Sequence, residues 1–305
     1  MPVAPDVRAA QLRAGVVGWF ADHGRDLPWR AEDRTGWGVL VSEVMLQQTP
    51  VVRVLPAWLS WMARWPAAPD LAAASTADVL RAWGNLGYPR RALRLHECAR
   101  VVTDRHRGSV PTDEATLLAL PGIGAYTAAA VVAFAHGGRS VVLDTNVRRV
   151  LARIEAGRAR PAPHLTTAEL AQAGTLVPAD PAEAAAWAAA SMELGALVCT
   201  ARAPRCDSCP VARLCRWRQV GQPADDGAHR RRTQAWAGTD RQARGQVMAQ
   251  LRAAGAPVSL PTLQQVWPDR AQLDRCLRSL VADGLVEAPT AASRPMYQLP
   301  LSPAR

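Results

Sequence analysis

The stretch Leu120–Phe134, LPGIGAYTAAAVVAF, places a proline and two glycines immediately before an apolar run with helical character. Because glycine has no Cβ, Gly122 and Gly124 allow a tight backbone turn and the close approach of a bulky partner. Apolar side chains recur at helical spacing on both sides of this turn. The sequence therefore predicts two helices, over residues 113–120 and 125–135, joined by a short hairpin.

The start of the second helix, just after Gly124, is a candidate anion site. Its first N–H groups have no partner within the helix, and they carry the positive end of the helix dipole. The chain has a formal net charge of +10, and a nucleic-acid phosphate is the obvious anion for such a cationic chain. An ordinary glycine hairpin between two packed helices is the alternative, and the turn alone does not separate the two.

Alanine and leucine dominate the rest of the chain, and apolar residues recur at helical spacing, which predicts an all-α protein. A chain of 305 residues is long for one hydrophobic core, so we expect two or more domains. Further helices are predicted over residues 9–22, 37–48, 51–64, 76–83, 92–105, 146–156, 167–176 and 181–197.

The chain changes character after residue 220. Residues 221–240 are rich in Gly, Pro, Asp and Arg, which is typical of a linker. Three predicted helices follow, over residues 241–254, 260–266 and 269–283, and an extended segment ends the chain. Three helices followed by a hairpin-like tail are the order of elements in a winged helix.

Composition also bears on location and on chemistry. Residues 1–10 lack the charged and apolar regions of a secretory signal, and no apolar stretch is long enough to span a membrane. We therefore expect a soluble, cytoplasmic protein that acts without a membrane. The 36 Lys and Arg residues are all arginines, so no side-chain amine is available for Schiff-base chemistry.

Four of the six cysteines form a cluster, CTARAPRCDSCPVARLC, with C-x6-C-x2-C-x5-C spacing. They are Cys199, Cys206, Cys209 and Cys215. Four thiolates within so short a segment can surround one metal centre, and the spacing itself leaves zinc and an iron-sulfur cluster both open. Disulfides are rare in a cytoplasmic chain. Cys98 and Cys276 each stand alone in a helical pattern and read as small buried hydrophobes.

The PGIG turn, Asp144 downstream of it and the cysteine cluster occur together and in this order. This combination resembles the helix-hairpin-helix DNA glycosylases that carry an iron-sulfur cluster. Within them, VSEVMLQQTPV (Val41–Val51), GNLGY (Gly84–Tyr88), LPGIGAYT and LDTNVRRVLAR are similar to the adenine DNA glycosylases, the MutY family. The resemblance covers about residues 10 to 220.

The resemblance implies a fold and a division into domains. A six-helix barrel domain with the helix-hairpin-helix would occupy residues 31–140, and an iron-sulfur helical domain would combine residues 1–30 with 141–220. After the linker at 221–240, residues 241–305 would form a small C-terminal domain. This last segment is too short for the Nudix-like domain of typical members, so the chain resembles a short form of the family.

The resemblance also implies a monofunctional glycosylase of base excision repair that hydrolyses the N-glycosidic bond of adenine mispaired with 8-oxoguanine or G. Glu43 would protonate adenine N7 and then activate water, because its apolar surroundings in VLVSEVML suit an acid that keeps its proton near neutral pH. Asp144 would stabilise or trap the sugar cation. Tyr126, one of three tyrosines, would hydrogen-bond Asp144, and Asn146 would help to order the water.

Asp144 and Glu43 each have a simpler explanation as well. Asp144 stands directly before a predicted helix, where aspartate is an expected N-cap, and capping would favour its ionised form. Glu43 could instead lie on the solvent-facing side of an amphipathic helix.

A target base must leave the stack to react, so the resemblance implies residues that fill the gap and residues that hold the base. Gln48 and Tyr88 would be the wedge residues beside the orphaned opposite base. The pocket walls would be Arg25, Leu27, Trp29, Leu46 and Val51. Read without the family, these are ordinary core, turn and loop residues.

The resemblance further implies a [4Fe-4S] cluster on the four clustered cysteines, double-stranded DNA with adenine mispairs as the partner, and action as a monomer. Ala189 departs from the pattern, because relatives often have Gln or Glu there in contact with the adenine edge. Two alternatives stay open: a bifunctional endonuclease III-type glycosylase/lyase acting on oxidised pyrimidines, and a non-enzymatic, metal-stabilised DNA-binding protein. Bifunctional relatives carry a nucleophilic lysine in the turn, where this chain has Tyr126.

Overall fold

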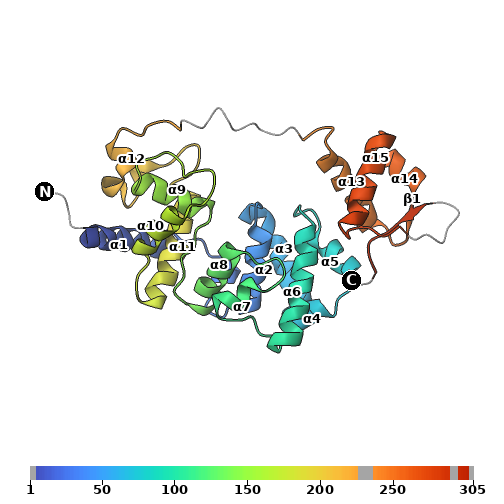
Figure 1. Cartoon of the computed structure of the whole chain (residues 1–305), viewed down its shortest axis with the longest axis horizontal. Coiled ribbons are helices and arrows are strands. Elements are labelled where there is room, and N and C mark those ends of the chain that lie inside the picture. Colours follow the sequence, from blue (N-terminus) through green and yellow to red (C-terminus); the bar gives the residue numbers. More distant parts are fainter. Residues whose placement is uncertain (1–4, 226–235, 289–294, 302–305) are drawn as a thin grey trace. The chain divides into compact units, whose positions relative to one another are not determined.

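The computed structural model describes residues 5–225, 236–288 and 295–301 (Figure 1). The chain forms two compact units. The first combines residues 1–39, 112–118 and 123–232, and the second combines residues 40–111, 119–122 and 233–305. In these units α7 and α8 group with the segments at the N-terminus and around the cysteines. The domain boundaries inferred from the sequence remain a prediction.

Helices make up the first unit, and a buried apolar core holds them together. They are α1 (Pro5–His23), α7 (Glu114–Leu118), α8 (Ala125–His136), α9 (Thr145–Ile154), α10 (Thr167–Leu176), α11 (Pro181–Leu197) and α12 (Arg216–Gln219), with short 3-10 turns at Pro28–Arg30, Cys206–Ser208 and Ala212–Leu214. Helix α11 packs against α1 and α9. Leu12, Val150 and Leu194 are fully buried where these three helices meet.

The second unit begins within α2 (Gly36–Leu46) and includes α3 (Val51–Arg64), α4 (Ala68–Ala72), α5 (Thr76–Trp83) and α6 (Arg90–His106). Its core is rich in tryptophan. The ring of Trp61 packs edge-on against Trp65 and Trp83, with ring centroids 4.7 Å and 5.7 Å apart. Such edge-to-face pairs add to the stabilisation that comes from burying the rings.

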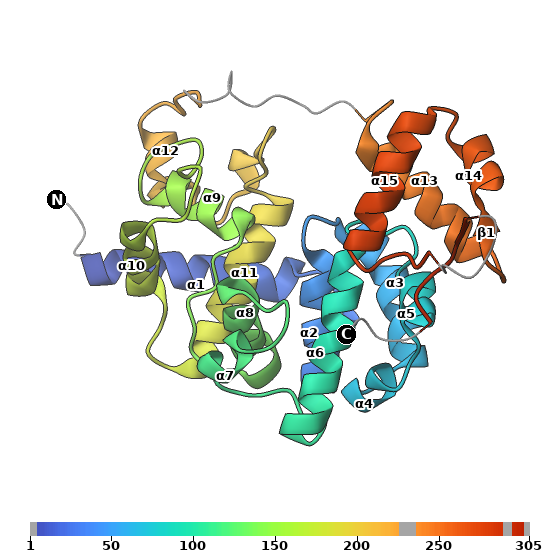
Figure 2. The same ribbon diagram turned by 45° about the vertical axis from the view of Figure 1, so that its right-hand side comes forward.

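The C-terminal part of the second unit is a small body of its own (Figure 2). Helix α13 (Asp240–Ala253) is followed by β1 (Val258–Ser259), α14 (Leu260–Val266), α15 (Arg270–Ala282) and β2 (Met296–Tyr297). The two strands pair antiparallel, and a further bridge joins Glu287 to Gln298. The three helices follow in the predicted order, whereas β1, which lies between the first two and pairs with β2, was not predicted. Residues 226–235 of the predicted linker and 289–294 of the predicted tail lie outside the described residues.

The predicted all-α class is confirmed, since the strands of the described residues are limited to this two-residue pair. Helix boundaries differ from prediction in places: α2 ends at Leu46 rather than at residue 48. Pro50 follows closely and disfavours a helical conformation in the residue before it, and Gln48 adopts a left-handed backbone with φ 54°. In the described ranges 5–225, 236–288 and 295–301, no helix combines the length and apolar character that a membrane crossing needs.

The two glycines of the hairpin have different roles. Gly122 has φ 78°, and a Cβ placed on it would lie 2.8 Å from the Cβ of Arg94 on α6. Gly124 is the N-cap of α8 with φ −101°, and a Cβ there would meet nothing within 4 Å. The turn therefore requires glycine at Gly122, whereas Gly124 leaves open space at the start of the helix.

Replacing Gly122 with alanine should destabilise the protein by about 1–3 kcal/mol, because the new Cβ meets both an unfavourable backbone conformation and the α6 side chain. Gly124→Ala is the matched control and should change the free energy of unfolding by less than about 0.5 kcal/mol. Urea denaturation followed by circular dichroism measures both. Equal stabilities for the two variants would contradict this account of the turn.

Candidate active site and metal centre

Asp144 caps α9, as its position before the helix predicted. Its Oδ1 accepts a hydrogen bond from the backbone N–H of Val147 at 2.6 Å, and its Oδ2 accepts one from Nδ2 of Asn146 at 2.8 Å. Burial raises the pKa of Asp144, and the hydrogen bonds from Val147 and Asn146 oppose this rise without cancelling it. The direction is opposite to the expectation from capping alone, because the carboxylate is less solvated than an ordinary N-cap.

Arg149 fixes the orientation of the Asn146 amide. Its guanidinium donates to Oδ1 of Asn146 at 2.8 Å, to the carbonyl of Gly195 at 2.7 Å and to the carbonyl of Cys199 at 2.8 Å. Because the oxygen of the amide is held by Arg149, its nitrogen is left to face Asp144. The structure thus brings two predicted site residues together, and it links them through one arginine to the first clustered cysteine.

Sequence reasoning missed Arg149. The available signal was its spacing alone, since an arginine three residues after Asn146 lies on the same side of a helix as Asn146. The structure buries Arg149, and a charged side chain taken out of water must find partners inside the protein.

Tyr126 lies in the first turn of α8 and is half-buried. It packs against a cluster of small apolar residues: Ala129, Ala130, Ala133, Val142 and Ala188. Two of these, Val142 and Ala188, come from the loop before Asp144 and from α11, so Tyr126 lies at the junction of three segments. The predicted hydrogen bond from Tyr126 to Asp144 stays a prediction.

Arg25 belongs to a buried ion pair that the sequence did not reveal. Its Nε and Nη2 donate to the two carboxylate oxygens of Glu193 at 2.6 Å and 2.8 Å, and Nη2 of Arg30 donates at 2.9 Å. Glu193 is fully buried on α11. Burial alone would raise the pKa of Glu193, but the hydrogen bonds from Arg25 and Arg30 outweigh it and lower the pKa to about 2.

Leu27 and Trp29, also expected in the pocket wall, are buried, with 4% and 5% of their surfaces exposed. The roles of Arg25, Leu27 and Trp29 against a substrate base remain predictions. Glu193 could have been found from the sequence, because it stands in an apolar run, MELGALVC, just as Glu43 does in VLVSEVML.

Glu43 is buried in the second unit. It lies on α2 with 4% of its surface exposed, and the neighbouring residues Ser42, Val41 and Met45 are all fully buried. The alternative of a solvent-facing glutamate on an amphipathic helix is therefore wrong. A buried carboxyl group with apolar neighbours fits the expectation of an acid that works away from bulk water.

The two predicted wedge residues share an unusual backbone. Gln48 has φ 54° and Tyr88 has φ 47°, and they are two of only four non-glycine residues with positive φ in the described part of the chain. Tyr88 is 45% exposed, and Gln48 is exposed as well. Strained backbone of this kind persists only where surrounding contacts hold it, and it is concentrated at functional sites. Leu46 and Val51, on either side of Gln48, are half-buried.

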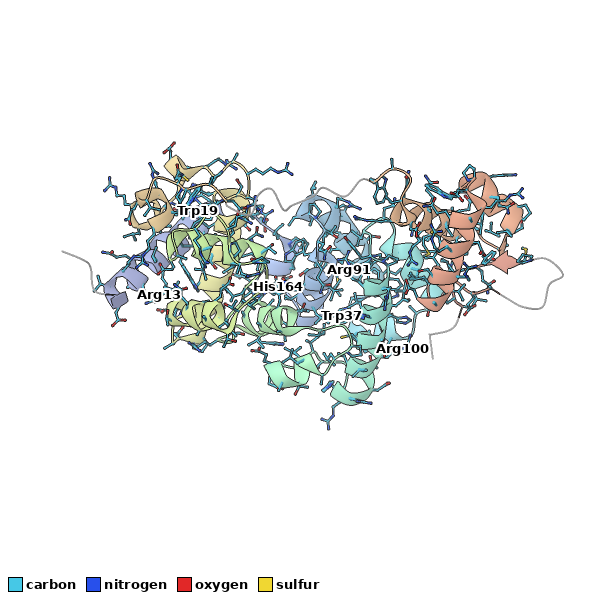
Figure 3. All side chains as sticks on the ribbon, turned by 45° about the horizontal axis from the view of Figure 1, so that its top comes forward. Arg13, Trp19, Trp37, Arg91, Arg100 and His164 are labelled. Atoms are coloured by element: carbon cyan, nitrogen blue, oxygen red, sulfur yellow. The ribbon has the colours of Figure 1, made fainter. Side chains whose placement is uncertain are left out.

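A single arginine on α6 holds both wedge segments. Nη1 of Arg91 donates to the carbonyls of Val44, Met45 and Gln47 at 2.8, 3.0 and 2.7 Å, and Nη2 donates to Gly87 at 3.1 Å. Burial lowers the pKa of Arg91 to about 10, so the side chain keeps its charge at neutral pH. Arg91 lies among the helices of the second unit (Figure 3). It ties the end of α2 to the turn that carries Tyr88.

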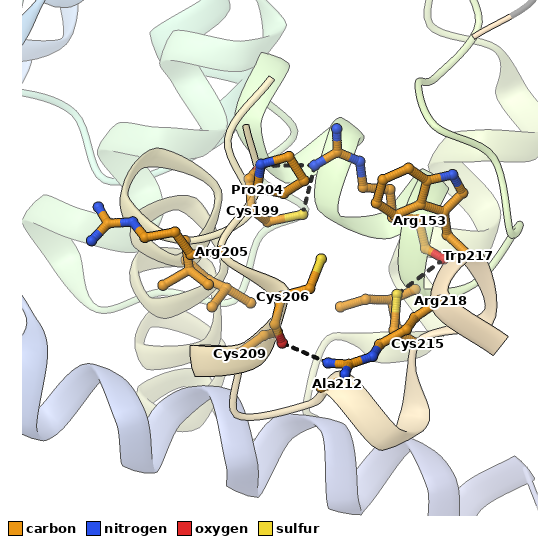
Figure 4. Close-up of a pocket in the computed structure, with 13 residues that line it drawn as sticks. Arg153, Cys199, Pro204, Arg205, Cys206, Cys209, Ala212, Cys215, Trp217 and Arg218 are labelled. Atoms are coloured by element: carbon orange, nitrogen blue, oxygen red, sulfur yellow. Dashed lines mark hydrogen bonds between the residues drawn. The ribbon is translucent and has the colours of Figure 1, made fainter. Parts of the chain in front are cut away.

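The four clustered cysteines line one pocket in the first unit, together with residues of α9, α11 and α12 (Figure 4). Their thiols receive hydrogen bonds from nearby side chains: Nη1 of Arg153 lies 3.2 Å from Sγ of Cys199, and Nε2 of Gln222 lies 3.2 Å from Sγ of Cys206. Arg153 also stacks on Trp217, with its guanidinium carbon 4.6 Å from the ring centroid. Donors of this kind stabilise thiolates that bind a metal.

The four thiols that line this pocket are the donor set that would hold a metal centre. Burial raises the pKa of the Cys209 thiol to about 11 and also raises that of Cys215, so binding of iron would have to displace their protons.

Comparison with known proteins agrees with this arrangement. Residues 41–175 match the HhH-GPD superfamily of base excision DNA repair proteins, and residues 199–215 match the iron-sulfur binding domain of endonuclease III. Among solved structures, a thermostable thymine-DNA glycosylase superposes with a TM-score of 0.64 at 26% identity, over 72% of this chain and all of the other. An endonuclease III–DNA complex, at 22% identity and a TM-score of 0.59 over 72% of this chain and 98% of that chain, supports the fold.

The curated relatives fix the family. The chain is 54% identical over 274 residues to the adenine DNA glycosylase of Mycolicibacterium smegmatis, covering 89% of this chain and 91% of that protein. It is 44% identical over 217 residues to the human adenine DNA glycosylase, covering 68% of this chain and 39% of that protein. The first alignment is longer than the part of the chain before the linker, so it reaches into the C-terminal domain. With this identity over nearly its whole length, the chain is a member of the adenine DNA glycosylase family, and it carries the [4Fe-4S] cluster of that family.

Proposed function

We propose that this protein is a monofunctional DNA glycosylase of base excision repair that removes adenine mispaired with 8-oxoguanine or guanine. The observation that carries the proposal is the buried Glu43 in the SEVMLQQT segment of a chain 54% identical to an adenine DNA glycosylase. The net charge of +10 suits a partner made of phosphates. The partner is double-stranded DNA, and the protein acts on it as a monomer in the cytoplasm.

In the proposed reaction, Glu43 gives its proton to N7 of adenine, so that the base leaves as a neutral molecule. The bond between the base and C1′ breaks through a sugar with oxocarbenium character, which the negative charge of Asp144 stabilises. Glu43, now ionised, takes a proton from the water that adds to C1′. The products are free adenine and an intact abasic site, and Glu43 is again protonated.

Asn146 and Tyr126 serve Asp144 in this reaction. The Asn146 amide, held by Arg149, donates to Asp144 and helps to place the attacking water. Tyr126 would donate its phenol hydrogen to the same carboxylate. Because Asp144 already accepts two hydrogen bonds, its orientation is set before a substrate arrives, which is how an electrostatic stabiliser works best.

Adenine must leave the duplex before it can react, and the exposed pair of Gln48 and Tyr88 would occupy the space beside the orphaned base. The start of α8 at Gly124 would accept a backbone phosphate, since a Cβ at Gly124 would meet nothing within 4 Å and the first N–H groups of a helix favour an anion. Leu46, Val51, Leu27, Trp29 and Arg25 would border the base pocket.

Cys199, Cys206, Cys209 and Cys215 would hold the [4Fe-4S] cluster. When bound, the cluster supplies structural support to the segment between its ligands. That segment carries Arg202 and Arg205, which would face the phosphate backbone. The bond cleavage itself needs only the two carboxylates and water.

Replacing Glu43 with glutamine should lower the single-turnover rate of adenine release by about 10²–10⁴-fold, since glutamine can neither donate nor take the proton. Binding of the same duplex should remain within about threefold, because affinity depends mostly on phosphate contacts. Duplexes with A opposite 8-oxoguanine and A opposite G serve as substrates. Glu97→Gln, an exposed glutamate on α6, is the control. Retained turnover in Glu43→Gln would remove Glu43 from the mechanism.

Protein purified without oxygen should be brown and contain about four iron atoms per chain. Cys209→Ser should lose the colour and most of the iron, whereas Cys98→Ala, outside the cluster, should keep both. Iron analysis and visible absorption make the measurement. Stoichiometric zinc without visible absorption would contradict the iron-sulfur assignment.

The absence of lysine separates this function from the bifunctional alternative. A phenol at Tyr126 cannot form an imine with the sugar, so borohydride should trap no covalent adduct with abasic or adenine-mispaired duplexes. The DNA should be cut only after alkali or a separate lyase is added. Endonuclease III is the positive control. Efficient trapping, with strand nicking as fast as base release, would restore the lyase reading.

A further inference from the structure

Five side chains of the second unit form a ladder in which aromatic rings and guanidinium groups alternate. Arg91 lies 5.2 Å from the ring of Trp83 and 5.6 Å from the ring of Tyr88, measured from the guanidinium carbon to the centroid. The guanidinium carbon of Arg241 lies 5.2 Å from the centroid of the same Tyr88 ring and 5.1 Å from the centroid of the Trp236 ring. The order is therefore Trp83, Arg91, Tyr88, Arg241, Trp236.

The ladder crosses from the barrel helices to the C-terminal domain, and polar contacts accompany it. Asp283, at the end of α15, accepts a hydrogen bond from Arg244 at 2.6 Å and forms an ion pair with Arg90 at 3.4 Å. Arg252 of α13 donates to the side chain of Asn85 at 2.9 Å, and α13 packs on α5. The contacts to Asn85 and Arg90 lie on either side of Tyr88, in the turn before α6 and at the start of α6.

The two guanidinium groups on Tyr88 are held differently. Arg91 is fixed by carbonyl groups of α2 and of the turn, so it cannot follow the tyrosine if the ring moves. Arg241 is an exposed residue in the first turn of α13, and its contacts with Tyr88 and Trp236 connect the C-terminal domain to the ring. Tyr88 thus contacts two cations, Arg91, which is fixed by backbone carbonyls, and Arg241, which belongs to the C-terminal domain.

The charges of the C-terminal domain favour this role over groove binding. Between residues 236 and 288 the chain has six arginines and five aspartate or glutamate residues, so this segment contributes little to the net charge of +10. On α15, Arg275 pairs with Asp240, and Arg278 pairs with Asp274. Two of the three arginines of α15 are neutralised in this way, which makes the helix poorly suited to collect phosphates.

We propose that Arg241 is a positioning residue through which the C-terminal domain holds Tyr88, in its strained backbone conformation, ready to enter the duplex. This inference rests on the proposed function, since it takes Tyr88 as a wedge residue. The ring of Tyr88 is stabilised by two nearby cations, Arg91 and Arg241, and each such contact accounts for a several-fold preference for the held conformation. The C-terminal domain therefore acts on base flipping and not on the chemical step or on general DNA affinity.

The first test needs no DNA. In Arg241→Ala, the backbone amides of residues 84–88 should exchange hydrogen about three- to fivefold faster than in the wild type, since one cation contact of about that strength is lost. Arg241→Lys should restore part of the protection. Arg270→Ala, which removes an exposed arginine on α15, is the control and should leave this segment unchanged. Unchanged exchange in Arg241→Ala would overturn the inference whatever the enzyme does.

The second test uses a double-mutant cycle with Tyr88→Leu. A 2-aminopurine next to the mispaired adenine reports base flipping. Arg241→Ala alone should slow flipping and single-turnover release by about three- to fivefold, with affinity for undamaged duplex unchanged. In the Tyr88→Leu background, Arg241→Ala should have no further effect, because the ring on which it acts is gone.

Three outcomes of the cycle would overturn the inference: additive effects of the two substitutions, faster flipping in Arg241→Ala, or a loss of affinity for undamaged duplex with a smaller salt dependence. The last would make Arg241 a phosphate contact. Failure of the proposed function would look different, because the wild type would then release no adenine. The hydrogen exchange of residues 84–88 would still test the contact between Arg241 and Tyr88, since that measurement uses no DNA.

Discussion

The partly buried guanidinium of Arg91 is the constraint on which the segments that carry Gln48 and Tyr88 depend. A charge taken out of water needs hydrogen-bond partners, and the last carbonyls of a helix need donors that the helix cannot supply. Both Nη atoms of Arg91 are hydrogen-bonded, to carbonyls that include those of Val44 and Met45 in the final turn of α2, whereas its buried Nε has no hydrogen-bond partner. The positive charge also lies at the negative end of the helix dipole. The same contacts hold Gln48 and Tyr88 in left-handed backbone conformations that would otherwise relax.

The first unit uses the same device at other helix ends. Arg149 joins α9 to the end of α11 by bonding the carbonyls of Gly195 and Cys199, and Arg153 bonds the carbonyl of Thr200 at 2.8 Å. Arg25 and Arg30 share one buried glutamate. A planar guanidinium offers five donors in fixed directions, whereas an ammonium offers three on a flexible stem. In this chain without lysine, Arg149 and Arg153 supply hydrogen bonds to backbone carbonyls near Cys199 that no regular helix satisfies.

Sequence predicted those features whose cause is local. Helical periodicity predicted the all-α class, the position of Asp144 predicted its cap, and the apolar run around Glu43 predicted its burial. The role of Arg91 could not be predicted, because its α2 partners lie more than forty residues away and are backbone atoms with no signature in the sequence. The raised pKa of Asp144 likewise depends on how completely neighbouring segments cover it. Glu193 is different, since the criterion that identified Glu43 would have found it.

Asp144 and Tyr88, which are proposed to act at the sugar and beside the orphaned base, are held in place in different ways. Asp144 is held by the start of its own helix and by Asn146, whose amide is in turn fixed by Arg149. Tyr88 is held from outside, by a guanidinium on α6 and by another on α13, and its backbone is strained. A residue with a strained backbone that is held by contacts from both α6 and α13 changes its conformational preference when either contact is lost. In the proposed role of Arg241, control of base flipping therefore comes from a domain that supplies none of the proposed catalytic residues.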